Sequence, residues 1–301
     1  MSDMDTRDGA FDVEPIVARL RALLGREGVS DDYVRLRADV LVAQAAALAA
    51  LNDSRGRRAS SPIPASPEKK RCPALVAERV PVDAAQARRL FDAVVRACGQ
   101  FGNAVADLAR LRSAVDGDPG LLESLIRWAA FEPDAEHLAS VAGCPDVSPE
   151  LLLLVGRLVA APLVTCAVRR VVQSGVEPPE SDGSCPACGS TPGLASLGPD
   201  DGRRVLHCSL CGHAWPFGRL ACPFCARDDG ATLTRLTVDG EDARWIEACD
   251  RCRHYLKVID RRSLPEAEPF TPLVEEVAGL YLDLVAEKEG HLGNLPYAAL
   301  K

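Results

Sequence analysis

Four Cys-x-x-Cys pairs lie between residues 185 and 252, and they constrain what this chain can fold into more than any other feature. The pairs are Cys185/Cys188, Cys208/Cys211, Cys222/Cys225 and Cys249/Cys252. Each such turn directs two sulfurs toward one tetrahedral centre, so two turns together supply the four thiolates that bind one zinc or iron ion. The eight cysteines therefore predict two metal ions per chain, either iron or zinc.

The lengths of the loops between the pairs indicate which pairs share an ion. Nineteen residues separate Cys188 from Cys208 and twenty-three separate Cys225 from Cys249, which are usual spacers within one metal-binding ribbon. Only ten residues lie between the second pair and the third, as in a linker between modules. We expect the first two pairs to bind one ion and the last two pairs to bind the other. A cross-braced order, first pair with third and second with fourth, is the alternative and uses the chain less economically.

Short β-prone runs alternate with the cysteine turns from Ser184 to Asp260. They are Arg203–His207, Ala231–Val238, Arg244–Ala248 and Tyr255–Val258. This alternation is typical of zinc-ribbon or rubredoxin-like modules, which are too small to bury much core and obtain folding free energy from the metal. We predict a first module at 183–218 and a second at 219–262.

The remainder of the chain is predicted to be helical, which makes the fold class α+β. Residues 1–182 form the α-helical domain, with a flexible Ser/Pro/Gly/Arg-rich segment at about 52–70, and residues 263–301 form a C-terminal helix and tail. The expected helices cover 11–50, 83 to about 101, 119–131, 149 to about 173, and roughly 273–289. The Ser148-Pro149-Glu150 start is a capping hydroxyl, a proline at the first helical position and an acid at the positive end of the helix dipole.

Charge and hydropathy narrow the class of protein. The net charge is −8, and residues 183–262 hold eleven Lys and Arg against ten Asp and Glu, which argues against a general nucleic-acid binder. The acidic N-terminus lacks the features of a secretory signal, and the twelve cysteines suit a reducing cytoplasm where paired thiols hold metal. The most apolar run, Leu151–Val168, contains Arg157 and Pro162, so we expect a buried helix and no membrane span.

The other candidate residues are assigned no direct role in metal binding or catalysis. His207, His213 and His254 flank the cysteine turns and are interpreted as neighbours of the metal, because eight thiolates already complete two sites. Isolated cysteines in or beside helical segments are interpreted as small hydrophobic residues without a role. They are Cys72, Cys98, Cys144 and Cys166. No nucleophile triad, phosphate-binding glycine loop or dinucleotide fingerprint is present, so no catalytic residue is predicted.

The segments around the cysteines have distinctive sequences. They read Cys185-Pro-Ala-Cys188-Gly-Ser-Thr-Pro192, Leu206-His207-Cys208-Ser-Leu-Cys211 with Trp215, Cys222-Pro-Phe-Cys225, and Ala248-Cys249-Asp-Arg-Cys252 running into Tyr255-Leu256-Lys257. A closing stretch, Leu280-Tyr-Leu-Asp283-Leu with Glu289-Gly290, follows. Over residues 183–290 the chain resembles the FdhE formate dehydrogenase accessory proteins, and its helical half is similar to theirs in length and character. It departs from them at Val274–Ala278, which stands where the family usually has acidic residues near Asp-Leu-Ala-Thr.

The resemblance implies a cytoplasmic maturation factor that is not an enzyme. Such a protein would bind the catalytic subunit of formate dehydrogenase, which carries a molybdenum or tungsten cofactor and an iron–sulfur cluster, before that subunit is exported. Carried over by position, the eight paired cysteines are the functional residues, and iron is the metal proposed for the family. Two alternatives stand beside this interpretation. One is a zinc-ribbon nucleic-acid or transcription module, and the other is a rubredoxin-like electron-transfer or thiol-redox protein.

Overall fold

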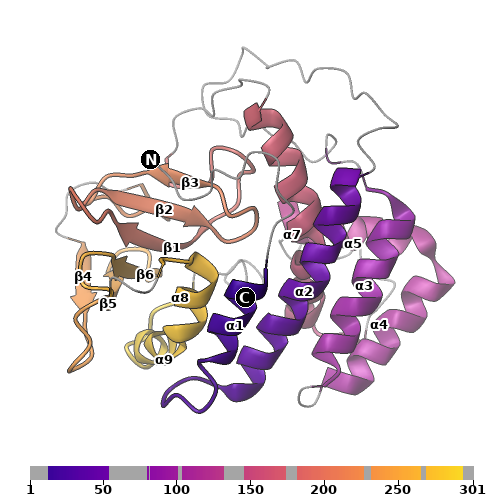
Figure 1. Ribbon diagram of the computed structural model, residues 1–301, viewed down its shortest axis with the longest axis horizontal. Coiled ribbons are helices and arrows are strands. Elements are labelled where there is room, and N and C mark those ends of the chain that lie inside the picture. Colours follow the sequence, from indigo (N-terminus) through magenta and orange to yellow (C-terminus); the bar gives the residue numbers. More distant parts are fainter. Residues whose placement is uncertain are drawn as a thin grey trace.

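A helical part precedes a part built on one β-sheet (Figure 1). The computed structural model describes residues 13–53, 80, 82–100, 104–131, 146–173, 182–226, 232–265 and 269–293. Most of the predicted flexible segment, residues 54–70, lies outside these residues, and so do Cys72 and Cys144. The mixture of helices and a sheet that carries two clusters of four cysteines confirms the predicted α+β class.

The helices of the first part pack in two apolar clusters, of which the smaller contains the first helix. These helices are α1 (Glu14–Arg21), α2 (Asp31–Asp53), α3 (Ala84–Cys98), α4 (Val105–Gly117), α5 (Pro119–Phe131) and α7 (Pro149–Gln173). Asp83 caps α3 as predicted, because its carboxylate accepts a hydrogen bond of 2.8 Å from the Gln86 N–H. The Ser148 hydroxyl accepts one of 3.3 Å from the Leu151 N–H at the start of α7.

The prediction that residues 11–50 are helical holds for most of the described part of this stretch and fails at the turn over residues 22–30. Two helices occupy this stretch, because the chain turns between Ala22 and Ser30, where Gly25 and Gly28 both adopt φ +77°. That conformation is open to glycine and costly for other residues, so it ends α1 and lets α2 start in a new direction. The apolar periodicity continues through the turn and hides it.

Helix α7 is the centre of the helical part, as the nearly continuous apolar sequence predicts. Val155, Val159 and Val164 are fully buried, and α7 packs against both α5 and α2. By length and composition alone this helix could cross a membrane, but 78% of its most apolar 18-residue window is buried inside the structure. That burial favours the core-helix interpretation.

The six strands form one continuous sheet in the order β3-β2-β1-β6-β5-β4. Their bounds are β1 (Pro192–Leu197), β2 (Arg204–Cys208), β3 (Ala214–Pro216), β4 (Leu233–Leu236), β5 (Arg244–Cys249) and β6 (Tyr255–Asp260). The four predicted runs correspond to β2, β4, β5 and β6. Neighbouring strands are antiparallel except at the seam between β1 and β6, which run parallel with Leu194 opposite Lys257 and Leu197 opposite Asp260.

The C-terminal helix expected near residues 273–289 is divided in two. Helix α8 (Pro272–Ala278) and helix α9 (Leu280–Lys288) meet at Gly279. Val277 of α8 packs with Val17 and Leu20 of α1, so α8 joins the two parts of the molecule. Leu282 of α9 packs under the sheet with Ile246.

Buried charges fix these helices to the sheet. Glu275 of α8 is 1% exposed and pairs with Arg244 of β5 at 2.7 Å. Lys257 of β6 pairs with Asp283 of α9 at 2.8 Å, and the Tyr255 hydroxyl donates to the same carboxylate. Val274–Ala278, where the sequence departs from the family pattern, thus supplies a structural ion pair in this chain.

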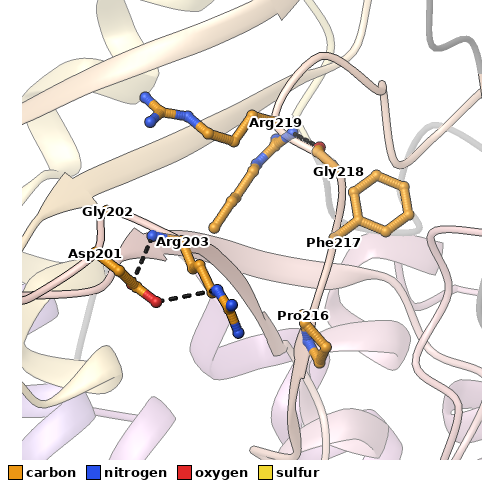
Figure 2. A pocket seen from close by; sticks show the side chains of 8 residues that line it. Asp201, Gly202, Arg203, Pro216, Phe217, Gly218 and Arg219 are labelled. Carbon is orange, nitrogen blue, oxygen red and sulfur yellow. Dashed lines mark hydrogen bonds and ion pairs between the residues drawn. The ribbon is translucent and has the colours of Figure 1, made fainter.

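The surface is hollowed where β2 begins and β3 ends. A shallow pocket of about 460 Å³ opens there, beside the linker that joins the two cysteine-bearing halves of the sheet (Figure 2).

Candidate metal centres

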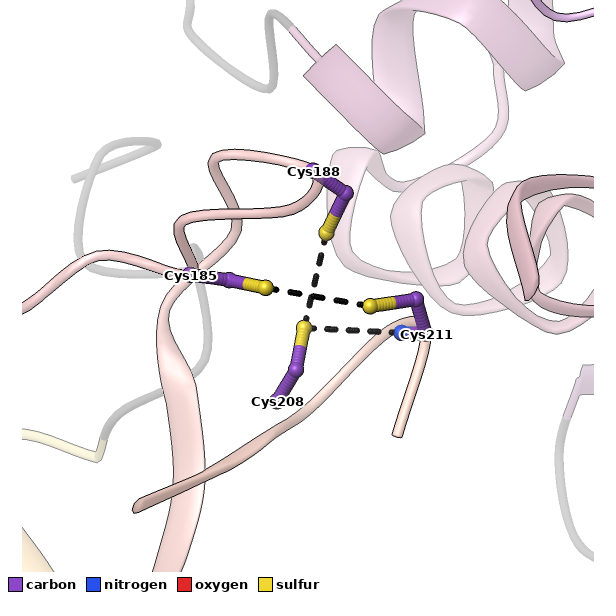
Figure 3. Close-up of side chains that lie close together, drawn as sticks. All are labelled: Cys185, Cys188, Cys208 and Cys211. Carbon is purple, nitrogen blue, oxygen red and sulfur yellow. Dashed lines mark hydrogen bonds between the residues drawn. The ribbon is translucent and has the colours of Figure 1, made fainter. Parts of the chain in front are cut away.

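The first two Cys-x-x-Cys turns converge on one point. Figure 3 shows the sulfurs of Cys185, Cys188, Cys208 and Cys211 directed at a common centre. The distance between Sγ atoms is 3.8 Å for Cys185 and Cys211 and 3.5 Å for Cys188 and Cys208, and all four atoms lie within 4.8 Å of one another. All four side chains are buried. We refer to this cluster as centre 1.

The last two turns form the same arrangement, which we refer to as centre 2. The Sγ atoms are 3.7 Å apart for Cys222 and Cys252 and 3.8 Å apart for Cys225 and Cys249. Cys222 and Cys249 are buried, whereas Cys225 and Cys252 are partly exposed. The structure thus groups the cysteines sequentially and not in the cross-braced order.

The spacing of the sulfurs fits a metal ion. A tetrahedral ion with metal–sulfur bonds of about 2.3 Å places its ligands about 3.8 Å apart, whereas a disulfide needs about 2.05 Å. The four separations given above lie between 3.5 and 3.8 Å. Each cluster could therefore hold one ion, and each of these four separations joins sulfurs of two different turns.

All four turns share one backbone conformation. The residue after the second cysteine has positive φ in each, namely Gly189 (+82°), Gly212 (+69°), Ala226 (+56°) and Arg253 (+61°). The sequence indicates this conformation at the two glycines but not at Ala226 or Arg253, where it costs about 1 kcal/mol. The turns that contain Gly189, Ala226 and Arg253 are closed by a hydrogen bond of 2.8 or 2.9 Å from the N–H of that residue to the carbonyl of the first cysteine.

Backbone amides in the turns stabilise negative charge on sulfur. The N–H groups of Leu210 and Cys211 both lie 3.4 Å from the Cys208 Sγ. Burial opposes ionisation of Cys208, but hydrogen bonds from the other three thiols and the Cys211 amide hold the pKa of this thiol well below its usual value. Cys208 therefore loses its proton more readily than Cys188 or Cys211, whose pKa values are raised.

Centre 2 shows the same division between its thiols. Burial opposes ionisation of Cys249, yet the N–H groups of Cys252 and Arg251 lower the pKa of this thiol to about 7. Burial raises the pKa of Cys252 to about 11 and raises that of Cys222 further. Cys208 and Cys249 thus supply thiolate to their centres most readily among the thiols with a shifted pKa, and binding of an ion would displace protons from thiols such as Cys222 and Cys252.

Helix α7 covers centre 1 with a buried arginine. Arg157 is 8% exposed, and its guanidinium donates to the Ser190 hydroxyl at 3.1 Å and to the Ser209 hydroxyl at 2.9 Å. Ser190 follows the first turn of the centre and Ser209 lies within the second. Four thiolates on a divalent ion carry a net charge of −2, so this cation offsets part of the charge while it joins both turns to the helical domain.

Centre 2 is supported from the linker that precedes it. The guanidinium of Arg204, on β2, donates to the carbonyls of Gly218 and Ala221 at 3.1 and 2.9 Å, immediately before Cys222. Arg204 also pairs with Glu247 at 2.8 Å. Burial raises the pKa of Glu247, and the Arg204 charge opposes that rise.

The histidines near the turns make contacts of their own. The His207 Nε2 lies 2.8 Å from the Ser196 hydroxyl, His213 stacks on Trp215, and the His254 Nδ1 lies 3.0 Å from the Cys252 carbonyl oxygen. That these side chains are neighbours and not ligands of the metal stays a prediction.

The two isolated cysteines that the structure describes lie in the helical core. Cys98 of α3 and Cys166 of α7 are both buried. Burial raises the pKa of Cys98 to about 11, so it is protonated at neutral pH. This agrees with the interpretation of these cysteines as small hydrophobic residues.

The cysteine-bearing half matches two family models. Residues 184–219 match the central domain of FdhE, and residues 220–296 match its C-terminal domain. The Protein FdhE homolog of Haemophilus influenzae (strain PittGG) is 33% identical over 119 residues, which are 39% of this chain and 38% of that protein. Protein FdhE of Escherichia coli O1:K1 / APEC is 34% identical over 110 residues, or 36% of this chain and 34% of that protein. The similarity thus spans little more than a third of the length of these relatives.

The fold extends the likeness to the helical part. The crystal structure of the FdhE protein from Pseudomonas aeruginosa has a TM-score of 0.61 to this chain, is 24% identical in sequence, and covers 94% of each chain. At that identity the comparison shows a common fold. Residues 184–296 are thus similar in sequence to the central and C-terminal domains of FdhE, and the whole chain shares the fold of an FdhE protein.

Proposed function

We propose that this protein is an accessory protein for formate dehydrogenase and that it catalyses no reaction of its own. It binds the catalytic subunit of that enzyme in the cytoplasm, as the family resemblance implies. The observation that carries the proposal is the pair of four-cysteine clusters on one continuous sheet, within the residues that match the FdhE domains.

Two ions per chain, iron or zinc, would be held by the two clusters. Cys185, Cys188, Cys208 and Cys211 bind one, and Cys222, Cys225, Cys249 and Cys252 bind the other; the separations between their sulfurs support both assignments. The ion crosslinks turns that are too short to hold their conformation alone. Residues 183–218 and 219–262 then act as the two metal modules, between the helical domain at 1–182 and the C-terminal helices within 263–301.

The chain's own residues give each centre its character. At centre 1, Arg157 and the amides of Leu210 and Cys211 offset thiolate charge in a buried environment. At centre 2, two partly exposed cysteines bring the thiolate charge close to the surface. Bound iron would change that charge by one unit between its ferrous and ferric states, so oxidation would alter a docking face near centre 2.

The metal is identified by elemental analysis and an absorption spectrum of protein purified without air. We expect two ions per chain. Iron–thiolate charge-transfer bands would identify iron and a redox-sensitive face, whereas a colourless protein with stoichiometric zinc and no reactive thiols would exclude electron transfer and thiol redox chemistry. Thiols found free or joined as disulfides in freshly isolated, folded protein would contradict the proposal.

The accessory role is tested with Cys222→Ala and Cys249→Ala. Both variants are expected to lose the ion of centre 2, to bind the catalytic subunit of formate dehydrogenase less well, and to lower formate oxidation in cells. Cys98→Ala is the matched control, because it removes a buried thiol outside both centres. Full activity of metal-free variants would refute the role assigned to the centres.

A further inference from the structure

The pocket between the two modules has an arginine-rich lining. We refer to it as the linker pocket. Its lining residues are Asp201, Gly202, Arg203, Arg204, Pro216, Phe217, Gly218 and Arg219. They come from the turn between β1 and β2, from the start of β2, and from the linker that leads to Cys222 (Figure 2). The pocket therefore lies on the segment that joins centre 1 to centre 2.

Two arginines at this junction are already committed to structural pairs. Arg204 is buried and pairs with Glu247 at 2.8 Å while it holds the linker carbonyls. Arg262, which follows β6, pairs with Asp260 at 2.7 Å through a carboxylate that is 12% exposed. These pairs set the shape of the pocket and are not free to meet a ligand.

The other two arginines are available. The Arg203 side chain is 84% exposed and its pair with Asp201, at 3.0 Å, is an exposed one of the kind that contributes little. Arg219 is exposed and forms no hydrogen bond or ion pair with any residue that the structure describes. The net charge at this junction is about +1, because four arginines stand against three carboxylates. The arginines are Arg203, Arg204, Arg219 and Arg262, and the carboxylates are those of Asp201, Glu247 and Asp260. Two guanidinium groups thus face solvent, and a carboxylate can bind such a fork through two parallel hydrogen bonds.

An exposed apolar residue follows Arg219 in the chain, next to the residues that line the pocket. Leu220 is 65% exposed, the largest fraction among the large hydrophobic residues of the described chain. Phe217 and Pro216 form the neighbouring wall of the pocket, and Phe217 also packs partly against the core. Arginine and aromatic residues with an exposed aliphatic residue next to them in the chain are the composition of a protein-binding surface rather than of a solvated face.

We propose that Arg203, Arg219 and Leu220, with the linker pocket, bind a peptide segment of a partner protein that carries a carboxylate beside an aliphatic side chain. Charge complementarity favours an acidic group in the partner, because the exposed guanidinium groups of Arg203 and Arg219 are positively charged. They stand out on a protein whose net charge is −8. The pocket is shallow and open, which suits a segment laid across it. A small phosphate-bearing molecule would use the two guanidinium groups and leave Leu220 without a function.

The proposed function identifies the partner as the catalytic subunit of formate dehydrogenase, and the inference rests on it for that identity alone. Binding of the full-length, metal-loaded chain to this subunit is measured for Arg219→Glu and Leu220→Ser. Each is expected to weaken binding by about tenfold or more. The matched controls are Arg110→Glu on α4 and Leu284→Ser on α9, whose side chains are similarly exposed and distant in sequence. If both variants bind like the parent protein, the proposed surface is wrong while the accessory role stands.

A second measurement does not depend on formate dehydrogenase. Random twelve-residue peptides displayed on phage are selected on the full-length, metal-loaded protein, with inorganic pyrophosphate titrated in parallel. We expect peptides that combine Asp or Glu with Leu, Ile or Val, and we expect Arg219→Glu to abolish their capture. If the parent protein fails to bind the subunit, the proposed function fails and this selection alone decides the surface. Selection of no such peptides, or pyrophosphate binding that needs Arg203 and Arg219 but not Leu220, would overturn the proposal.

Discussion

Replacing Arg157 by methionine tests whether one side chain joins the helical domain to centre 1. Its guanidinium donates to the Ser190 and Ser209 hydroxyls at 3.1 and 2.9 Å and to the Ala129 carbonyl at 3.4 Å. Hydrogen bonds to a charged group contribute about 1.5–3 kcal/mol each to stability. The variant no longer has to desolvate a charged guanidinium on folding, which offsets part of the loss. The Ser190 and Ser209 hydroxyls are not left without a hydrogen-bond partner in the variant. They lie 3.4 Å apart, and Ser209 also donates to the Thr191 carbonyl. We expect the free energy of unfolding to fall by about 3 kcal/mol.

The assay is urea denaturation of the metal-loaded, full-length chain, followed by chelator-induced metal release under native conditions. The variant is expected to unfold at lower urea and to release the ion of centre 1 faster, since both turns of that centre lose their common anchor. Arg110→Met is the control, because Arg110 is 56% exposed and, among the described residues, its one ion pair is with a neighbouring acid on its own helix. An unfolding free energy within about 0.5 kcal/mol of the parent protein, with unchanged release, would refute the anchor.

Three further predictions concern the cysteines and one close contact. A chelator is expected to remove the two ions in two phases, centre 2 first, because only Cys225 and Cys252 of the eight paired cysteines are partly exposed. Cys225→Ser should abolish the fast phase. A single phase in the parent protein would contradict this prediction. At pH 8 the pKa of about 11 leaves roughly 0.1% of Cys98 as thiolate, so iodoacetamide should label it about a hundredfold more slowly than an ordinary thiol, as followed by mass spectrometry. Because the raised pKa keeps the thiol neutral, its labelling rate should rise about tenfold per pH unit up to pH 11, and a rate independent of pH would argue against it. Gly183→Ala should lower the free energy of unfolding by about 2 kcal/mol or more, since φ is +126° and a Cβ there would lie 2.0 Å from the Pro223 carbonyl oxygen. Gly117→Ala is the control and should be nearly neutral, because a Cβ at Gly117 meets nothing within 4 Å.

The sequence predicts features that depend on local chemistry. The spacing of the cysteines is enough to group them, because a short turn must deliver both of its sulfurs to one centre. The starts of α3 and α7 follow from Asp83 and from Ser148-Pro149, whose capping geometry is set within a few residues. These are interactions between neighbours in the chain, and a pattern of residue types can represent them.

Features that depend on distant contacts escape the sequence. Strand β1 has the sequence Pro-Gly-Leu-Ala-Ser-Leu, which has little β-propensity, and it is a strand because β2 and β6 pair with both of its edges. The three-residue strand β3 and helix α4 also have no counterpart among the predicted elements. Arg157 reads in the sequence only as a charge that interrupts an apolar run, because its partners lie 28 to 52 residues away.

The parallel seam between β1 and β6 makes the two centres parts of one folding unit. Separating the chain into two fragments between residues 219 and 220 would turn β1 and β6 into open edges with unpaired amides and carbonyls. Open strand edges pair with other chains. Either fragment alone would therefore tend to associate with copies of itself, even with its ion bound. Loading of one centre stiffens a strand that the other half needs as its neighbour, so the ion of centre 1 would be held less tightly once centre 2 has lost its own.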